Sequence, residues 1–246
     1  MKTLDSLKIK LFADGADKAG MLELYANPWI KGFTTNPTLM RKAGISDYQA
    51  FAREIILAIP DRPISFEVFA DDFAGMEHQA LEIASWGSEV YVKVPVTDTK
   101  GAPTYSVIKR LAQLGVKVNV TAMMTLEQVA DVADCLAGGP RPMFLYSVAE
   151  SPTPDGIQFH SCPGPWEMLS ATPNIELIWA SPRELLNVFQ AEASGCHIIT
   201  ATSDILKKLS LVGKDLSEYS LDTVKMFYDD ARQAGYEIYS LATSGR

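Results

Sequence analysis

Short β-branched or aromatic runs alternate with longer helical patterns along almost the whole chain of 246 residues, and this alternation constrains the fold more than any other feature. Eight runs are expected to be strands: Ile9–Ala13, Gly32–Thr35, Ile64–Phe69, Val90–Val96, Val116–Thr121, Met143–Val148, Ile175–Ala180 and His197–Ala201. Between them, apolar residues at three- and four-residue spacing predict helices, among them Tyr48–Ala58, Phe73–Ser85, Thr104–Leu114, Leu126–Leu136 and Arg183–Ala193. Such alternation implies parallel strands with right-handed crossovers, and eight units of this size favour an α/β fold of the closed (β/α)8 TIM-barrel type.

An open, doubly wound sheet is the main alternative fold. It is disfavoured because no glycine-rich dinucleotide fingerprint follows the first expected strand. Near the end of the chain, Asp215–Gly235 predicts an extra amphipathic helix, whose apolar face is Leu221, Val224, Met226, Phe227 and Ala231. No linker or change of composition divides the sequence, so a single domain over residues 1–246 is expected.

Charge and cysteine usage restrict the partners and the compartment. Thirty acidic against 22 basic side chains give a net charge of −8, which argues against a nucleic-acid surface, although a local cationic pocket could still hold an anion. The three cysteines, Cys135, Cys162 and Cys196, lack metal-site spacing, and no two histidines have it either. No signal peptide or membrane span is expected, so the sequence predicts a cytoplasmic protein without a metal.

Lys93 is the most informative single residue. It sits inside the run Val90–Val96, which reads as a strand buried on both faces, where a lysine is least expected. Burying an ammonium costs several kcal/mol unless it is paired, and a buried lysine amine is the group that forms Schiff bases with carbonyl substrates. A lysine that snorkels from the strand end, or one held in a structural ion pair, is the alternative interpretation.

Other polar residues fall near the carboxyl ends of the expected strands, where barrel enzymes carry their chemistry. In chain order these residues are Asp14, Thr34-Thr35-Asn36, Glu67, Lys93, Asn119 with Thr121, Ser147, and Ser181 with Arg183. A single polar residue at a strand end is common. Seven strands that each contribute at least one polar residue there indicate a shared site. The alternative is a buried structural network in which Asp14 and Glu67 only neutralise Lys93.

These segments resemble the successive active-site segments of the transaldolase family, including the related fructose-6-phosphate aldolases. The matching segments are Phe12-Ala13-Asp14-Gly15, Thr34-Thr35-Asn36-Pro37-Thr38, Glu67, Val92-Lys93-Val94-Pro95, Asn119-Val120-Thr121 and Ala180-Ser181-Pro182-Arg183. They occur in order, one per expected strand, over nearly the whole chain. The resemblance implies a class I aldolase-type barrel that needs neither a metal nor an organic cofactor, and that moves a dihydroxyacetone unit between sugar phosphates in the pentose phosphate pathway.

The resemblance also implies a role for each candidate residue. Lys93 forms the Schiff base, Asp14 is the acid/base group at the reacting hydroxyl, and Glu67 with Thr121 positions the catalytic water. The substrate-binding set expected beside them is Thr34, Asn36, Asn119, Ser147, Ser181 and Arg183. In that set, Asn36 and Asn119 hold hydroxyls of the three-carbon unit, whereas Ser181 and Arg183 fit phosphate-binding positions.

One segment departs from the family pattern. After Ser147, transaldolases normally continue through Val-Phe-Ala-Gly-Arg toward Ile-Ala-Asp-Thr-Gly, and that arginine is a principal phosphate ligand. Here residues 148–166 contain no arginine. Reading the back-translated codons from their third base permits Gly-Arg-Ile-Ala-Asp-Thr-Gly followed by a helical continuation, and Glu167-Met168-Leu169 resumes in frame. We interpret the segment as the product of two compensating frame changes, in the gene or in the reported sequence.

Two classes of function follow. The first is an active transaldolase-type enzyme, with a fructose-6-phosphate aldolase-type lyase as its close variant, because similar segments serve both reactions. The second is a non-catalytic sugar-phosphate-binding barrel, which the altered loop makes conceivable. The partners expected are small sugar phosphates, with no nucleic acid and no membrane, and a homo-oligomer is left open.

Overall fold

The computed structural model describes residues 4–137, 139, 143–148 and 172–238. Two compact units make up the chain, residues 7–209 in one and residues 1–6 with 210–246 in the other. We describe each by itself.

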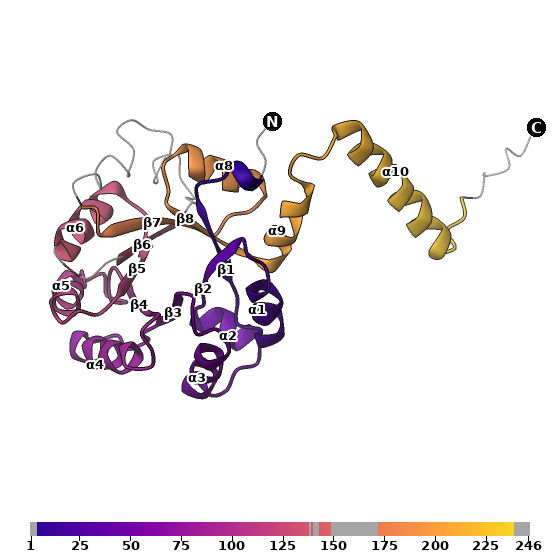
Figure 1. The fold of residues 1–246 in the computed structure, drawn as a ribbon. Helices are drawn as coiled ribbons and strands as arrows, with labels where there is room; N and C mark the ends of the chain where they lie inside the picture. Colours follow the sequence, from indigo (N-terminus) through magenta and orange to yellow (C-terminus); the bar gives the residue numbers. More distant parts are fainter. Residues whose placement is uncertain (1–3, 138, 140–142, 149–171, 239–246) are drawn as a thin grey trace, which may run out of the picture. The chain divides into compact units, whose positions relative to one another are not determined.

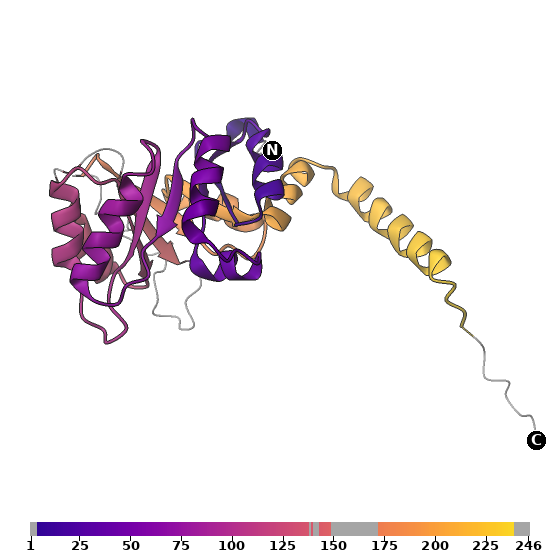
Figure 2. The same ribbon diagram turned by 90° about the horizontal axis from the view of Figure 1, so that it is seen from below.

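The larger unit contains eight strands in one parallel sheet, with helices around its outside (Figures 1 and 2). The strands are β1 (Lys10–Asp14), β2 (Ile30–Thr34), β3 (Ile64–Glu67), β4 (Val90–Pro95), β5 (Val118–Met123), β6 (Met143–Val148), β7 (Ile175–Ala180) and β8 (Ile198–Thr202). Each pairs with the next along the chain, and β1 also pairs with β8, so the sheet closes on itself. The predicted parallel α/β architecture is therefore confirmed. The helix expected after β6 falls in residues 149–171, outside the described residues, and the complete (β/α)8 repeat stays a prediction.

Helices follow most strands of this unit: α1 (Lys18–Tyr25), α2 (Pro37–Lys42), α3 (Tyr48–Ala58), α4 (Phe73–Ala84), α5 (Tyr105–Gln113), α6 (Leu126–Leu136), α8 (Leu186–Ala193) and α9 (Ser203–Lys207). Side-chain oxygens of Asp17, Asn36, Asp47 and Asp72 accept from the backbone N–H three residues on, which satisfies a donor that the first turn leaves free. The helix expected from Arg183 begins only at Leu186. Asn187 Oδ1 accepts from the N–H groups of both Arg183 and Glu184, which holds a turn there instead.

The core of the barrel comes from the apolar residues of the strands. Phe12, Tyr91, Ile178, Ala180 and Ile198 form one buried cluster inside it. Gly32 on β2 faces that cluster closely, because a Cβ added there would lie 2.5 Å from the Phe12 ring. Only glycine therefore lets β2 pack at this distance from the β1 side chain.

The smaller unit is dominated by α10 (Leu216–Gln233), which confirms the predicted C-terminal helix. Asp215 caps it by accepting from the N–H groups of Ser217 and Glu218. The described residues of its own unit leave the apolar face of this helix uncovered. None of the helices in the described ranges has the length and hydropathy that crossing a bilayer requires.

Candidate active site

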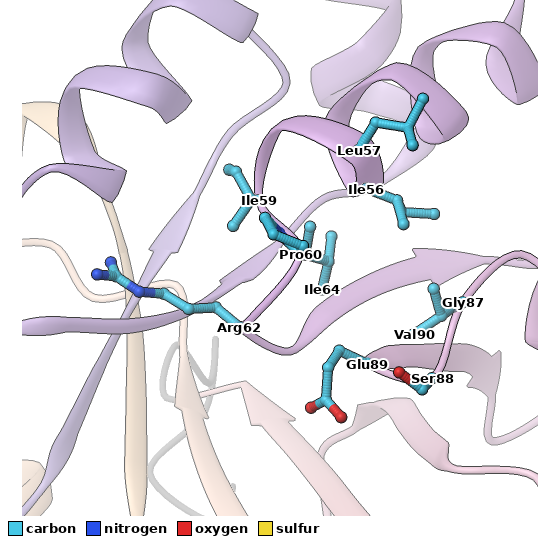
Figure 3. Close-up of a pocket in the computed structure, with 10 residues that line it drawn as sticks. All are labelled: Ile56, Leu57, Ile59, Pro60, Arg62, Ile64, Gly87, Ser88, Glu89 and Val90. Carbon is cyan, nitrogen blue, oxygen red and sulfur yellow. The ribbon is translucent and has the colours of Figure 1, made fainter.

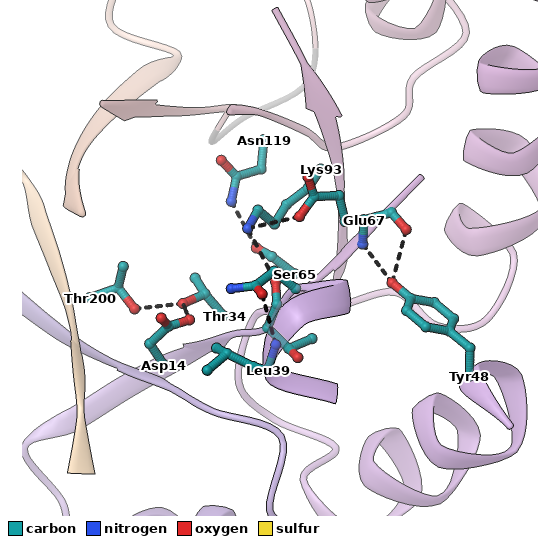
Figure 4. A network of polar contacts seen from close by, with 11 residues as sticks. Asp14, Thr34, Leu39, Tyr48, Ser65, Glu67, Lys93, Asn119 and Thr200 are labelled. Atoms are coloured by element: carbon teal, nitrogen blue, oxygen red, sulfur yellow. Dashed lines mark hydrogen bonds and ion pairs between the residues drawn. The ribbon is translucent and has the colours of Figure 1, made fainter. Parts of the chain in front are cut away.

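Strand register places the predicted catalytic residues at one level of the barrel. Lys93 on β4 is directly opposite Glu67 on β3 and Asn119 on β5. Because side chains alternate across a strand, residues opposite one another in register share a face of the sheet. The three side chains therefore converge within the barrel, as Figure 4 shows.

Lys93 is the centre of this group. Its side chain is only 2% exposed, and its Nζ lies 3.2 Å from Glu67 Oε2 and donates to the Thr35 carbonyl oxygen at 3.1 Å. Glu67 is 19% exposed, so the ion pair lies largely out of water, where each charge needs the other. The amine thus lies inside the barrel, and the side chain does not extend to the surface.

Asp14 and Thr34 are paired across the first two strands. Thr34 Oγ1 donates to Asp14 Oδ1 at 2.7 Å and lies 2.6 Å from Thr200 Oγ1 on β8 (Figure 4). Burial raises the pKa of the Asp14 carboxyl above its ordinary value of 3.8, while the charge of Lys93 and the Thr34 hydrogen bond work in the opposite direction. A carboxyl with a raised pKa is suited to accept and return a proton.

Asn119 has one satisfied and one unsatisfied polar atom. Its Nδ2 donates to Ser65 Oγ at 3.0 Å, which fixes the orientation of the amide. Its Oδ1 is buried without a hydrogen-bond partner in the described part of the chain, and so is the hydroxyl of Thr35. Buried polar atoms are normally paired, so the orphan Oδ1 of Asn119, whose residue is opposite Lys93 in register, indicates a place for a polar ligand.

Thr121 and Asn36 also lie toward the carboxyl ends of their strands. Thr121 is buried on β5, opposite Pro95 and two residues after Asn119, so it shares the face of Asn119. Asn36 lies two residues after the end of β2, where its Oδ1 accepts from the Leu39 N–H at 2.9 Å and caps α2. This cap holds the amide of Asn36 in one orientation.

The predicted phosphate-binding residues, Ser181 and Arg183, lie just after β7. Ser181 directly follows β7 and has a positive φ of 53°, a conformation that costs energy for a non-glycine residue. Arg183 is exposed on the turn that follows it. Ser147 lies on β6 opposite Trp179 of β7, and its side chain is not among those described. The segment expected to carry the frame change, residues 148–166, lies outside the described residues apart from Val148, the last residue of β6.

Three further residues join the site that the sequence did not predict: Ser65, Thr200 and Tyr48. Ser65 and Thr200 are polar residues in otherwise apolar buried strands, the same signal that drew attention to Lys93. Tyr48 opens α3, and its hydroxyl contacts the backbone of Glu67. Nothing in the spacing of the sequence indicates that contact.

A separate pocket lies at the opposite end of the strands (Figure 3). It is a hollow of about 230 Å³ between the end of α3 and the residues that precede β3 and β4, with Leu57, Arg62 and Glu89 on its walls. It includes none of the predicted site residues and is therefore not part of the candidate active site.

The histidines within the described residues do not join the site. His197 precedes β8, and its Nδ1 accepts from the Leu177 N–H at 3.0 Å, a structural role. His78 lies on α4. His160 is outside the described residues.

Comparison with known proteins agrees with the geometry. Residues 11–151 match the family model of transaldolase/fructose-6-phosphate aldolase. A "Probable transaldolase" of Thermoanaerobacter sp. (strain X514) is 32% identical over 94% of this chain and 100% of that protein. Another, from Pelotomaculum thermopropionicum, is 32% identical over 90% of this chain and 97% of its own length.

The fold is also shared with more distant proteins. Thiamine phosphate pyrophosphorylase from Pyrococcus furiosus superposes with a TM-score of 0.50 at 12% identity, over 80% of this chain and 86% of that one. At this identity the likeness concerns the fold alone. The sequence matches carry the assignment, because they extend over more than half of the chain and include the strands that bear Asp14, Glu67, Lys93 and Asn119. This chain belongs to the transaldolase/fructose-6-phosphate aldolase family.

Proposed function

We propose that this protein is a transaldolase that transfers a dihydroxyacetone unit between sugar phosphates through a Schiff base on Lys93. The observation that supports this most is the environment of the Lys93 amine, which is buried within the barrel and faced by the carboxylate of Glu67. A buried amine beside a carboxylate can be relieved of its proton and then attack a carbonyl carbon.

In the first step, Lys93 Nζ adds to the ketose carbonyl and the oxygen leaves as water. Glu67 is placed to take a proton from the ammonium and to return it to the departing hydroxyl, with Thr121 holding the water. The product is a protonated imine, which withdraws electrons from the neighbouring carbon–carbon bond far better than the neutral ketone does.

In the second step, that bond breaks. Asp14 takes the proton of the reacting hydroxyl, an aldehyde phosphate is released, and the electron pair of the broken bond moves into the imine to give an enamine. The raised pKa of Asp14 suits this exchange, since the same group must return the proton when a new aldehyde is attacked. Retention of the enamine until that attack gives a transferase, whereas its protonation and release give an aldolase.

The donor is recognised by the polar groups around the amine. The unpaired Oδ1 of Asn119 accepts from a hydroxyl of the three-carbon unit. Thr34 at the end of β2 and Asn36 two residues beyond it complete the donor-binding set. Ser181 and Arg183 bind the phosphate of the substrate, and Ser147 contributes to substrate binding.

We propose the broader setting on the same grounds. The larger unit, residues 7–209, forms a (β/α)8 barrel, and the chain needs no cofactor and acts on sugar phosphates in cytoplasmic carbohydrate metabolism. The apolar residues of α10 that its own unit leaves uncovered support self-association, because contiguous apolar surface of this kind commonly marks an interface. Light scattering of the wild type and of Val224→Glu/Phe227→Glu tests this: the variant should have a lower mass, and an equal mass would exclude α10 as the interface.

The activity is tested with fructose 6-phosphate in the presence and absence of an acceptor aldehyde phosphate. A transaldolase forms the new ketose phosphate only with the acceptor, whereas an aldolase releases dihydroxyacetone without it. Borohydride added to the fructose 6-phosphate mixture should attach the reduced three-carbon unit to one peptide, the one containing Lys93. Absence of any adduct would exclude Schiff-base chemistry and favour a non-catalytic binding barrel.

A further inference from the structure

Strand β2 ends at Thr34, before it can pair with Glu67, the last residue of β3. The two strands pair only at Phe33 with Ile64 and Thr34 with Ser65, and the last bond runs from the Thr35 N–H to the Ser65 carbonyl oxygen at 3.3 Å. In a parallel pair, alternate residues direct both backbone groups toward the same neighbour. The N–H and C=O of Glu67 therefore face the place where β2 has already turned away.

The hydroxyl of Tyr48 occupies that place. It accepts from the Glu67 N–H at 2.7 Å and donates to the Glu67 carbonyl oxygen at 2.9 Å, as Figure 4 shows. One hydroxyl is both acceptor and donor, so it satisfies the two groups as a strand residue would.

The ring of Tyr48 is itself fixed. It packs edge-on against Phe69, with centroids 5.4 Å apart, and lies within 6.3 Å of Phe66 and 6.2 Å of Trp86. Burial raises the pKa of its hydroxyl, which keeps the proton that the bond to the Glu67 carbonyl needs. The contact is thus a rigid one, built from α3, from β3 and the Phe69 that follows it, and from Trp86, which follows α4.

The carboxylate of Glu67 points away from Tyr48 toward Lys93, so the tyrosine anchors the backbone while the side chain serves the amine. We infer that Tyr48 is a positioning residue for Glu67, which sets how fast Lys93 exchanges protons during imine formation and hydrolysis. This inference rests on the proposed function and adds a residue to it. It concerns imine formation and not carbon–carbon cleavage, which depends on Asp14 on the other side of the site.

The test is Tyr48→Phe, which keeps the ring and removes only the hydroxyl. Single-turnover mixtures with fructose 6-phosphate are quenched with borohydride at set times, and the adduct and the released aldehyde phosphate are both measured. The imine should form about tenfold more slowly, whereas an imine once formed should decay to product at the wild-type rate. Tyr25→Phe is the matched control, because the Tyr25 hydroxyl donates to Asp61 elsewhere on the barrel. It should leave both rates unchanged.

A second comparison separates positioning from a structural role. In a Glu67→Gln background, Tyr48→Phe should have no further effect on imine formation, although it should lower the melting temperature as much as it does alone. A tenfold loss in both backgrounds, or a lowered melting temperature with an unchanged imine rate, would overturn the inference. If the wild type formed no adduct, the proposed function would fail and this inference with it. If the wild type and Tyr48→Phe formed the adduct equally fast, this inference would fail while the proposed function would stand.

Discussion

The Glu67 carboxylate lies 3.2 Å from the Lys93 amine, and the two residues are directly opposite in register on adjacent strands. A pair so placed is held by the sheet itself, since neither residue can move along its strand without breaking the pairing. An ion pair buried to this degree contributes little net stability, because removing both charges from water offsets most of their attraction. The proposed mechanism explains the arrangement better than stability does. In it the Lys93 amine must lose and regain a proton within one catalytic cycle, and the neighbouring carboxylate exchanges that proton.

Replacement of Lys93 by methionine should abolish borohydride trapping and turnover, since methionine has a similar length but no nitrogen to form an imine. The fold should persist, although the unpaired Glu67 carboxylate is expected to lower the melting temperature. Mass measurement of the trapped protein and circular dichroism check the two expectations.

Lys100→Met is the matched control for that experiment. Lys100 is exposed in the turn that follows β4, and its loss should leave adduct formation unchanged. An adduct on another lysine in the Lys93 variant would show that the nucleophile has been misassigned.

Asp14→Ala should slow carbon–carbon cleavage by on the order of a hundredfold while still permitting the Schiff base to form. In the proposed mechanism Asp14 is the proton acceptor for cleavage, whereas Glu67 exchanges the protons of imine formation. Accumulation of the borohydride-trapped six-carbon adduct, in place of the three-carbon one, would report this block. Unchanged turnover would instead make Asp14 a structural partner in the network.

Asp14→Asn should raise the melting temperature at neutral pH by a few degrees. Burial raises the pKa of Asp14 in the folded protein above 3.8, so the fold favours the protonated carboxyl. The protonated carboxyl contributes its full stability below pH 3.8, and this contribution is lost as the pH rises through the raised pKa of the folded protein. The advantage of asparagine should thus disappear in melting curves recorded below about pH 4, and an advantage that persisted there would have another cause.

Restoring Gly-Arg-Ile-Ala-Asp-Thr-Gly in place of the altered segment after Val148 should tighten the binding of fructose 6-phosphate by about ten- to a hundredfold. A charge-assisted arginine–phosphate contact is worth roughly 1.5–3 kcal/mol, and Arg183 alone supplies only part of it. Calorimetry on both proteins measures the difference, and equal affinities would show that this loop is not the phosphate clamp. Sequencing of the source DNA separately tests the frame change itself.

The fold was predictable because strand and helix signals agree with the tertiary structure along most of the chain. Tyr48–Ala58 and Leu126–Leu136 are helical with the bounds expected from their apolar spacing. The short helices α1, α2 and α9 were not predicted, since five to eight residues are too few to show a helical period. The exposure of the apolar face of α10 also lies beyond the sequence, because periodicity identifies a face but not what covers it.

The candidate site was predictable where a residue type contradicts its surroundings. Lys93 in a buried strand is such a case, and the same reasoning applied to Ser65 and Thr200 would have found them. Tyr48 could not be found in this way. A tyrosine at the first turn of a helix is ordinary, and its bonds to Glu67 arise only because β2 ends early.

The hydroxyls of Thr34 and Thr200 form a chain that ends on Asp14 and joins three neighbouring strands. A hydroxyl carries a single proton, so while Asp14 is ionised Thr34 must donate to it and accept from Thr200. When the carboxyl gains a proton, both hydroxyls can rotate and the chain can run the other way. A change in the charge of Asp14 therefore reverses the direction of two hydrogen bonds that extend to Thr200 on β8, and in the proposed catalytic cycle this reversal accompanies each proton transfer at Asp14.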